Sequence, residues 1–166
     1  MPVLLFICTA NQCRSPMAEV IGRHLLTDRY PAVDWQIGSA GVRAVNDYPA
    51  TPASALMAER HGFDLSRHRS RLLTKQMVAG ADLLVTMEAA HKRAILRDFP
   101  DVSGRVFTLG ELIGRGEDVD DPIGLPMQEY ERTYDLLAEW IEEALPRISS
   151  LVGRHKSITL MGEETK

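Results

Sequence analysis

Two cysteines and an arginine lie close together near the N-terminus, and their spacing predicts a nucleophile beside a bound anion. Cys8 and Cys13 are the 2 cysteines of the chain, and Arg14 stands six positions after Cys8. A thiolate is a strong nucleophile, and a guanidinium can donate to two oxygens of a tetrahedral anion at once. The hydroxyl of Ser15 can donate to the same sulfur. We therefore interpret Cys8 as the nucleophile and Arg14 as the group that holds the anion.

The segment that follows Cys8 is expected to wrap this anion with its backbone. The apolar run Val3–Ile7 predicts a buried strand, and Ser15 and Pro16 predict the N-cap and the first residue of a helix. A loop after a parallel strand lies where ligands bind, and a helix N-terminus offers free N–H groups and a positive dipole that favours a thiolate. The expected N–H donors belong to Thr9, Ala10, Asn11, Gln12, Cys13, Arg14 and Ser15. The pattern of a Walker loop is absent.

The two cysteines also have other interpretations. A disulfide framework or a four-cysteine zinc site needs more than 2 cysteines. The start of the chain has no basic segment, and Val3–Ile7 is too short for a signal peptide or a membrane span. We therefore expect a cytoplasmic protein with reduced thiols and no membrane partner. A reduced cysteine is most often a packing residue, but the arginine, the serine and the strand–helix boundary favour a nucleophile.

An acidic stretch at residues 117–121 supplies a candidate for a general acid. It follows a predicted strand, so it is expected at the same sheet edge as the Cys8 loop. Asp121 precedes Pro122, which restricts its backbone to extended conformations, and a rigidly held carboxylic acid suits protonation of a leaving oxygen. A solvated acidic turn is the alternative, and metal binding is a weaker one. Together with the cysteine loop, Asp121 is interpreted as the acid.

Strands and helices alternate along the chain. Predicted strands cover Val3–Ile7, Trp35–Gly38, Asp82–Met87 and Arg105–Leu109, and predicted helices cover Met17–Asp28, Ala53–His61, Thr74–Ala79, Glu88–Arg97 and a last helix containing residues 130–148. In that last helix apolar residues recur every three or four positions. This order predicts a single α/β domain, a four-stranded parallel sheet with helices on both faces. We place the domain at residues 1–152 and a polar C-terminal tail at residues 153–166.

The composition excludes several classes of protein. Of the 166 residues, 45% are hydrophobic and 25% are charged, which excludes disordered, collagen-like and coiled-coil chains. The formal net charge of -4 argues against a nucleic-acid partner, because such proteins are usually basic. An acidic protein does not attract phosphate as a whole, so its anion site has to be local.

With these residues in place, the chain resembles the low-molecular-weight protein tyrosine phosphatases. The segment from Cys8 to Pro16 matches the family's Cys-x5-Arg-Ser-Pro pattern, and Gly38–Gly41, His68–Arg71 and Asp121–Pro122 follow in the family's order. The resemblance covers residues 3–148. It implies a four-stranded parallel sheet flanked by helices and a hydrolase that needs no cofactor and no metal ion.

The resemblance also implies a role for each residue of the loop and its support. Cys8 attacks phosphorus and becomes phosphorylated, Arg14 and the loop N–H groups hold the oxygens, and Asp121 is first acid and then base. Hydrogen bonds beneath the loop are implied for Asn11, Ser15, Ser39 and His68, and asparagine tolerates the left-handed backbone that the loop needs. Ordinary surface or core polarity is the alternative for Ser39 and His68.

A redox role for the second cysteine is implied by the resemblance as well. Cys13 stands where the family carries a second loop cysteine, and a reversible disulfide between Cys8 and Cys13 would shield the nucleophile from further oxidation. A small buried residue without redox chemistry is the alternative for Cys13.

The sequence defines the substrate less well than the chemistry. Tyrosine phosphatases of the family usually carry aromatic residues after the Asp–Pro pair, where this chain has Ile123 and Gly124. Gln12 replaces an apolar loop residue of tyrosine phosphatases and a threonine of phosphoarginine phosphatases, whereas Thr9 is shared with the latter. Tyr48 is a candidate wall of the entrance, although a loop tyrosine is more often plain surface.

Several functions remain open at this stage. We expect a protein tyrosine phosphatase that acts on phosphorylated proteins or small phosphomonoesters, with phosphoarginine or sugar phosphates as alternative substrates. An arsenate reductase on the same fold would need a further cysteine for its usual relay, and the chain has only 2. A non-catalytic anion-binding module would need neither Cys8 nor Asp121.

Overall fold

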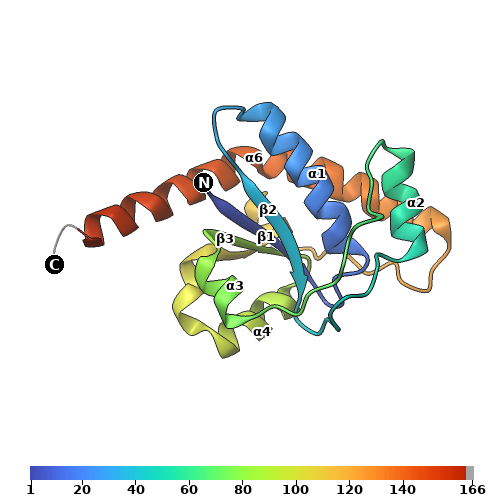
Figure 1. Cartoon of the computed structure of the whole chain (residues 1–166), viewed down its shortest axis with the longest axis horizontal. Coiled ribbons are helices and arrows are strands. Elements are labelled where there is room, and N and C mark those ends of the chain that lie inside the picture. The colour runs from blue at the N-terminus through green and yellow to red at the C-terminus, as the bar shows by residue number, and fades with distance from the viewer. Residues whose placement is uncertain (164–166) are drawn as a thin grey trace.

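Four parallel strands form the centre of the fold (Figure 1). In the computed structural model, which describes the backbone of residues 1–163 and the side chains as far as Arg154, the strands stand in the order β2-β1-β3-β4. They are β1 (Val3–Cys8), β2 (Gln36–Gly41), β3 (Leu83–Thr86) and β4 (Val106–Thr108). Each neighbouring pair runs parallel, which confirms the predicted fold class.

Helices cover both faces of this sheet. The helices packed on one face are α1 (Arg14–Arg29), α2 (Pro52–Arg60), α5 (Leu109–Leu112) and α6 (Met127–Glu163). The other face is covered by α3 (Lys75–Gly80), α4 (Ala89–Asp98) and the 3-10 helix η1 (Pro100–Arg105). Figure 1 shows α1 and α6 on one side of the strands and α3 and α4 on the other.

The central strand β1 explains why its apolar run shows no alternation. Leu4 and Phe6 pack into the core cluster beneath α1 and α6, whereas Leu5 and Ile7 pack into the cluster beneath α3 and α4. A strand buried on both faces needs apolar residues at every position. As a result, the carboxyl end of β1 and the cysteine loop lie at one edge of a rigid sheet.

The last helix is longer than its apolar stripe predicts. The six residues of that stripe are all buried, and they are Tyr130, Tyr134, Leu137, Ile141, Leu145 and Ile148. The helix α6 continues as far as Glu163, and residues 164–166 lie outside the described residues. Much of the segment placed in a polar tail is therefore helical, and the domain boundary at residue 152 stays a prediction.

Two element boundaries near the cysteine loop differ from the prediction. The helix α1 begins at Arg14 with Cys13 as the N-cap residue, so Ser15 is not the N-cap. The Ser15 hydroxyl instead contacts Cys8 and Asn11. The strand β2 runs to Gly41 rather than ending at Gly38, because residues 39–41 pair with the end of β1.

Two short helices were not predicted. Thr108 and Glu111 form a reciprocal capping box at the start of α5, with each side chain bonded to the other's backbone N–H. The Thr-x-x-Glu spacing is a known helix-start pattern, so the sequence did carry a signal for α5. The 3-10 helix η1 is a single short connection between α4 and β4, and such pieces have little periodicity to detect.

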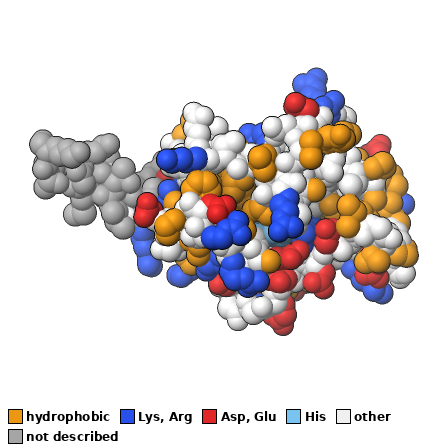
Figure 2. Space-filling model, turned by 90° about the horizontal axis from the view of Figure 1, so that it is seen from below, with side chains coloured by type: hydrophobic (Ala, Val, Ile, Leu, Met, Phe, Trp, Pro, Cys, Tyr) orange, Lys and Arg blue, Asp and Glu red, His pale blue; other side chains and the backbone are white. Residues whose placement is uncertain are grey.

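The surface carries both signs of charge. On the face shown in Figure 2, several Asp and Glu side chains gather below the centre, next to Lys and Arg. No helix in the described part of the chain is long and apolar enough to cross a membrane.

Candidate active site

The sulfur of Cys8 lies at the end of β1 and receives contacts from the loop that follows. Cys8 is buried, with 2% of its surface exposed. Its Sγ is 2.9 Å from Ser15 Oγ, and the backbone N–H of Asn11 donates to it over 3.3 Å. The sulfur is therefore in contact with a hydroxyl group and with a backbone donor of its own loop. This arrangement suits a nucleophile.

The shape of the loop depends on Asn11. Its φ of 57° lies in the left-handed region, which asparagine tolerates better than most residues. The fully buried side chain donates from Nδ2 to Ser15 Oγ and to Ser39 Oγ, each at 2.9 Å, and its Oδ1 accepts from the N–H of Arg71 at 2.9 Å. His68 Nε2 lies 2.7 Å from the Asn11 carbonyl oxygen. The structure thus brings together the four residues predicted beneath the loop.

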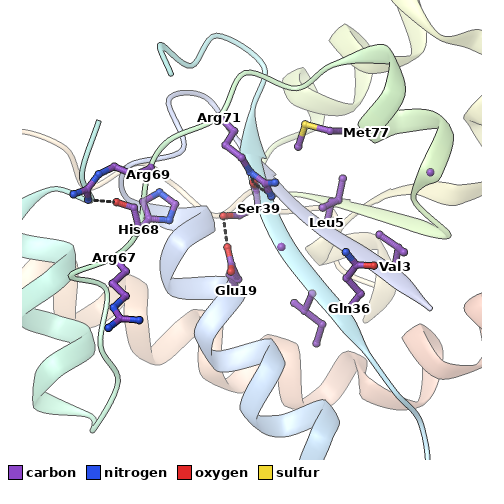
Figure 3. A pocket seen from close by; sticks show the side chains of 13 residues that line it. Val3, Leu5, Glu19, Gln36, Ser39, Arg67, His68, Arg69, Arg71 and Met77 are labelled. Atoms are coloured by element: carbon purple, nitrogen blue, oxygen red, sulfur yellow. Dashed lines mark hydrogen bonds between the residues drawn. The ribbon is translucent and has the colours of Figure 1, made fainter. Parts of the chain in front are cut away.

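Two further residues form hydrogen bonds with Ser39, one of the residues beneath the loop (Figure 3). Glu19 Oε2 accepts from Ser39 Oγ at 2.5 Å, and the guanidinium of Arg71 donates to the Ser39 carbonyl oxygen at 2.9 and 3.2 Å. Both line a cavity of about 660 Å³ beside β2. The sequence analysis did not single them out, although Arg71 lies inside the quoted His68–Arg71 motif and Glu19 inside the predicted helix.

Close backbone packing at the end of β2 confines the loop further. The N–H of Arg43 donates to the carbonyl oxygen of Thr9 at 3.0 Å. A Cβ on Gly41 would lie 2.4 Å from that oxygen and 2.9 Å from the Asn11 nitrogen, so only glycine fits there. The motif Gly38–Gly41 therefore supports the loop through Gly41 as well as through Ser39.

Arg14 enters the site from the first turn of α1 and is almost fully buried. Its side chain is 1% exposed; Nη1 forms an ion pair with Glu88 and donates to the carbonyl oxygen of Val119 at 2.7 Å. Its Nη2 lies 3.4 Å from Asp121 Oδ2 and 3.5 Å from Thr9 Oγ1. Nη1 is thus held by Glu88 and the Val119 backbone, whereas Nη2 faces Asp121, whose side chain is 35% exposed, so Nη2 is the end of the guanidinium nearer to solvent.

The predicted acid lies at the mouth of this arrangement. The side chain of Asp121 is 35% exposed, and its Oδ1 accepts from the N–H of Ile123 at 3.1 Å while Oδ2 faces Arg14. The neighbouring Pro122 is buried and anchors the turn. The structure therefore brings Cys8, Arg14 and Asp121 to one sheet edge, although Asp121 lies more than a hundred positions after the other two.

A second layer of polar residues, which the sequence analysis missed, comes from the start of α4. Glu88 is its N-cap and pairs with Arg14, while the backbone N–H of Glu88 donates to His91 Nδ1 at 3.1 Å. His91 Nε2 lies 2.8 Å from Thr9 Oγ1. Desolvation is the main cause that lowers the pKa of His91 below its ordinary 6.5, and the nearby Glu88 opposes it. The ring is therefore neutral at neutral pH.

Cys13 has a different environment from Cys8. Burial raises the pKa of the Cys13 thiol to about 12, and a hydrogen bond to Ser54 only partly opposes this. Both cysteines are free thiols in the structure. The reversible disulfide between them stays a prediction.

The residues considered for substrate recognition lie farther out. Gln12 Nε2 donates to the carbonyl oxygen of Pro49 at 3.3 Å, so its side chain is directed along the loop rim. Tyr48 and Ile123 are exposed, at 54% and 55%. Among the residues whose side chains are described, no group of three or more His, Cys, Asp or Glu could hold a metal ion.

Comparisons with known proteins agree with this geometry. The family described as "Low molecular weight phosphotyrosine protein phosphatase" matches residues 3–156. The chain is 37% identical over 148 residues to the probable low molecular weight protein-tyrosine-phosphatase EpsP of Ralstonia solanacearum, which covers 89% of this chain and 97% of that protein.

Solved structures show the same fold. The low molecular weight protein tyrosine phosphatase from T. tengcongensis superposes with a TM-score of 0.82 at 34% identity, covering 89% of this chain and 99% of that one. A mutant of the YwlE arginine phosphatase with a phosphorylated active site serine superposes with a TM-score of 0.82 at 32% identity, covering 89% and 95%.

Proposed function

The chain belongs to the low molecular weight phosphotyrosine protein phosphatase family, and we propose that it removes phosphate from tyrosine in proteins through a phosphorylated Cys8. Membership makes it a low-molecular-weight protein tyrosine phosphatase, a hydrolase that acts on phosphorylated substrates. Because a similar protein is an arginine phosphatase, the identity of the phosphorylated residue is part of the proposal.

One observation carries the proposed mechanism. The sulfur of Cys8 with its contacts to Ser15 and Asn11, Nη2 of Arg14 and the carboxyl group of Asp121 lie together at the carboxyl ends of the parallel strands. A bound phosphoryl group there would have the thiolate on one side and an acid on the other. That is the in-line arrangement that a displacement at phosphorus needs.

In the first step, the Cys8 thiolate attacks phosphorus and the P–S bond forms while the bond to the leaving oxygen breaks. Asp121 gives its proton to that oxygen. Arg14 Nη2 and the loop N–H groups donate to the other phosphoryl oxygens, whose charge they stabilise through the transition state. The phosphorylated active site serine of the arginine phosphatase mutant supports such a covalent intermediate.

In the second step, water attacks phosphorus and the P–S bond breaks, which releases inorganic phosphate. The Asp121 carboxylate now accepts the proton of the water. The Ser15 hydroxyl, 2.9 Å from the sulfur, stabilises Cys8 as it leaves as a thiolate. Both steps are completed by side chains and backbone of this chain.

The covalent intermediate provides the direct test. Wild-type protein is expected to hydrolyse para-nitrophenyl phosphate and a phosphotyrosine peptide, with or without a metal chelator, and rapid acid quenching should trap one phosphoryl group on Cys8. Cys8→Ser should abolish turnover while leaving the circular dichroism spectrum unchanged. Equal turnover by Cys8→Ser would overturn the mechanism.

A substrate panel tests the proposed specificity. Peptides with phosphotyrosine, phosphoarginine or phosphoserine, together with sugar phosphates and arsenate coupled to thioredoxin, should be compared by kcat/KM. We expect phosphotyrosine to be the best substrate. Gln12→Ile, which restores an apolar rim residue, should raise the preference for phosphotyrosine; a higher kcat/KM for phosphoarginine would replace tyrosine with arginine in the proposal.

The thiol chemistry also supports a cellular setting. A thiolate nucleophile stays active only where thiols are kept reduced, which supports a cytoplasmic location. Phosphorylated proteins or small phosphomonoesters are the proposed partners, and neither a nucleic acid nor a membrane surface is part of the proposal.

A further inference from the structure

The ring of His91 bridges the start of α4 and the cysteine loop. His91 is 4% exposed, and each of its two nitrogens has one hydrogen-bonding neighbour. The N–H of Glu88 donates to Nδ1 at 3.1 Å, and Nε2 lies 2.8 Å from Thr9 Oγ1. The ring is therefore held between a backbone donor and the hydroxyl of the residue that follows the nucleophile.

The first of these contacts decides which nitrogen carries the proton. A nitrogen that accepts a hydrogen bond has no proton, so Nδ1 is unprotonated. In a neutral imidazole the proton then resides on Nε2. Protonating Nδ1 would break its contact with the Glu88 N–H. His91 thus donates to Thr9 from Nε2.

This contact decides in turn what the Thr9 hydroxyl can do. A hydroxyl has one proton to donate and two lone pairs to accept with. Thr9 Oγ1 accepts from His91 Nε2 and lies 3.5 Å from a second donor, Arg14 Nη2. Because both of these neighbours are donors, neither uses the hydroxyl proton, which is available to a further acceptor.

The position of this donor identifies what it would contact. Thr9 Oγ1 lies beside Arg14 Nη2, the guanidinium end that also faces Asp121. We infer that the Thr9 hydroxyl donates a hydrogen bond to the bound phosphoryl group, and that His91 is the positioning residue that holds it in this role. The inference rests on the proposed function, because it places the phosphoryl group between Cys8 and Arg14.

Kinetics of paired variants test the two parts of this inference. Thr9→Val removes the hydroxyl with little change of shape and should lower kcat/KM for para-nitrophenyl phosphate about ten- to a hundredfold, since the lost bond is to a charged group. Thr9→Ser should recover activity to within about threefold of wild type. An unchanged kcat/KM for Thr9→Val would overturn the role of the hydroxyl.

A double-mutant cycle tests whether His91 acts through Thr9. His91→Leu should cause about the same loss as Thr9→Val, and the double variant should be no worse than either, because both remove one interaction. His91→Gln keeps one donor and one acceptor and should restore most of the activity. Losses that multiply in the double variant would show that His91 acts independently of Thr9.

Two measurements on folded protein keep the inference testable apart from turnover. Nitrogen NMR of wild-type His91 should find the proton on Nε2, and the Nδ1–H form would overturn the argument. In titrations with inorganic phosphate, Thr9→Val should bind about tenfold more weakly than wild type; equal binding would contradict the donor. Failure to trap phosphate on Cys8 would refute the proposed mechanism. The NMR and phosphate-binding results would still decide the roles of His91 and Thr9, because neither measurement depends on turnover.

Discussion

Arg14 illustrates how a single buried charge organises the site. It is 1% exposed, and Glu88 is its closest carboxylate partner. Removing one member of a buried pair leaves the other uncompensated. The pair therefore fixes the guanidinium in place, and breaking it costs stability although the intact pair adds little.

Glu88→Gln is expected to weaken both stability and activity. The free energy of unfolding should fall by about 1–3 kcal/mol, because Arg14 loses its charged partner although Glu88 is partly exposed. kcat/KM should fall as well. Chemical denaturation and steady-state kinetics measure the two effects, with Glu143→Gln as the control. That control breaks an exposed pair with Arg115 and should change neither quantity much; equal effects of both variants would contradict the role given to Glu88.

Asp121→Asn is expected to separate good from poor leaving groups. A general acid contributes roughly a hundredfold or more when the leaving oxygen is basic. The loss of turnover should therefore be large for an alkyl phosphate and much smaller for para-nitrophenyl phosphate. Asp120→Asn, which changes the neighbouring exposed carboxylate, is the matched control. Equal losses for the two substrates would argue against Asp121 as the acid.

The two cysteines are expected to react at different rates. The pKa of Cys13, raised to about 12 by burial, keeps that thiol protonated at neutral pH. Iodoacetamide at pH 7 should therefore modify Cys8 and leave Cys13 almost untouched, and mass spectrometry of peptides reads the ratio. Rapid alkylation of Cys13 in the native protein would contradict its buried, protonated state.

At the scale of elements, the cysteine loop takes its shape from the strand beside it. The end of β2 supplies Ser39 to the Asn11 side chain and leaves no room for a side chain at Gly41. The loop is thus supported by an element that the chain reaches only after α1. The hydrogen bonds within the loop, from Asn11 to Cys8 and to Ser15, are therefore reinforced by a strand that packs beside it.

Gly41→Ala is expected to distort the loop. The added Cβ would lie 2.4 Å from the Thr9 carbonyl oxygen, and since that atom is backbone the loop has to shift. Stability should fall by about 1–3 kcal/mol, and kcat/KM should fall more than stability alone explains. Gly80→Ala is the control, because nothing lies within 4 Å of its new Cβ. Thermal unfolding and kinetics of both variants provide the comparison; a fully active Gly41→Ala would contradict the tight packing.

At the scale of the whole molecule, charge and burial have separate consequences. The net charge of -4 and the acidic side chains seen in Figure 2 do not attract phosphate to the protein as a whole. Attraction has to come from the local donors around Cys8 and Arg14. Buried titratable groups, in contrast, affect the stability of the entire fold.

The unfolding free energy is expected to fall as the pH drops below 6.5. The pKa of His91 is lower in the folded protein than the ordinary 6.5. At pH values between the pKa of folded His91 and 6.5, the unfolded chain therefore binds a proton more readily than the folded protein does. Stability is therefore highest above 6.5 and declines below it. Urea denaturation at several pH values in this range measures how steeply the unfolding free energy depends on pH. This dependence should be weaker in His91→Gln. An identical slope in the variant would mean that other groups cause the decline.

How much the sequence determined can be judged at particular residues. Periodicity predicted the buried face of α6, and the apolar run of β1 predicted a strand covered on both sides, because burial needs apolar residues at regular positions. The Cys8 loop, Arg14 and Asp121 could be predicted because a local pattern and a resemblance both point to them, and the structure places them at one sheet edge. The predicted start of α1 was wrong, since the Ser15 hydroxyl contacts Cys8 and Asn11 instead of capping the helix.

Only the tertiary structure identified the residues that hold the site together. Glu88, His91, Arg71 and Glu19 carry no local pattern that relates them to Cys8, because their contacts join segments far apart in the chain. Sequence spacing defines what lies on one turn, strand or loop, whereas hydrogen bonds between separate elements depend on how the sheet packs. The chemistry of the loop could therefore be predicted from its own residues, whereas the way the loop is held in place depends on the tertiary fold.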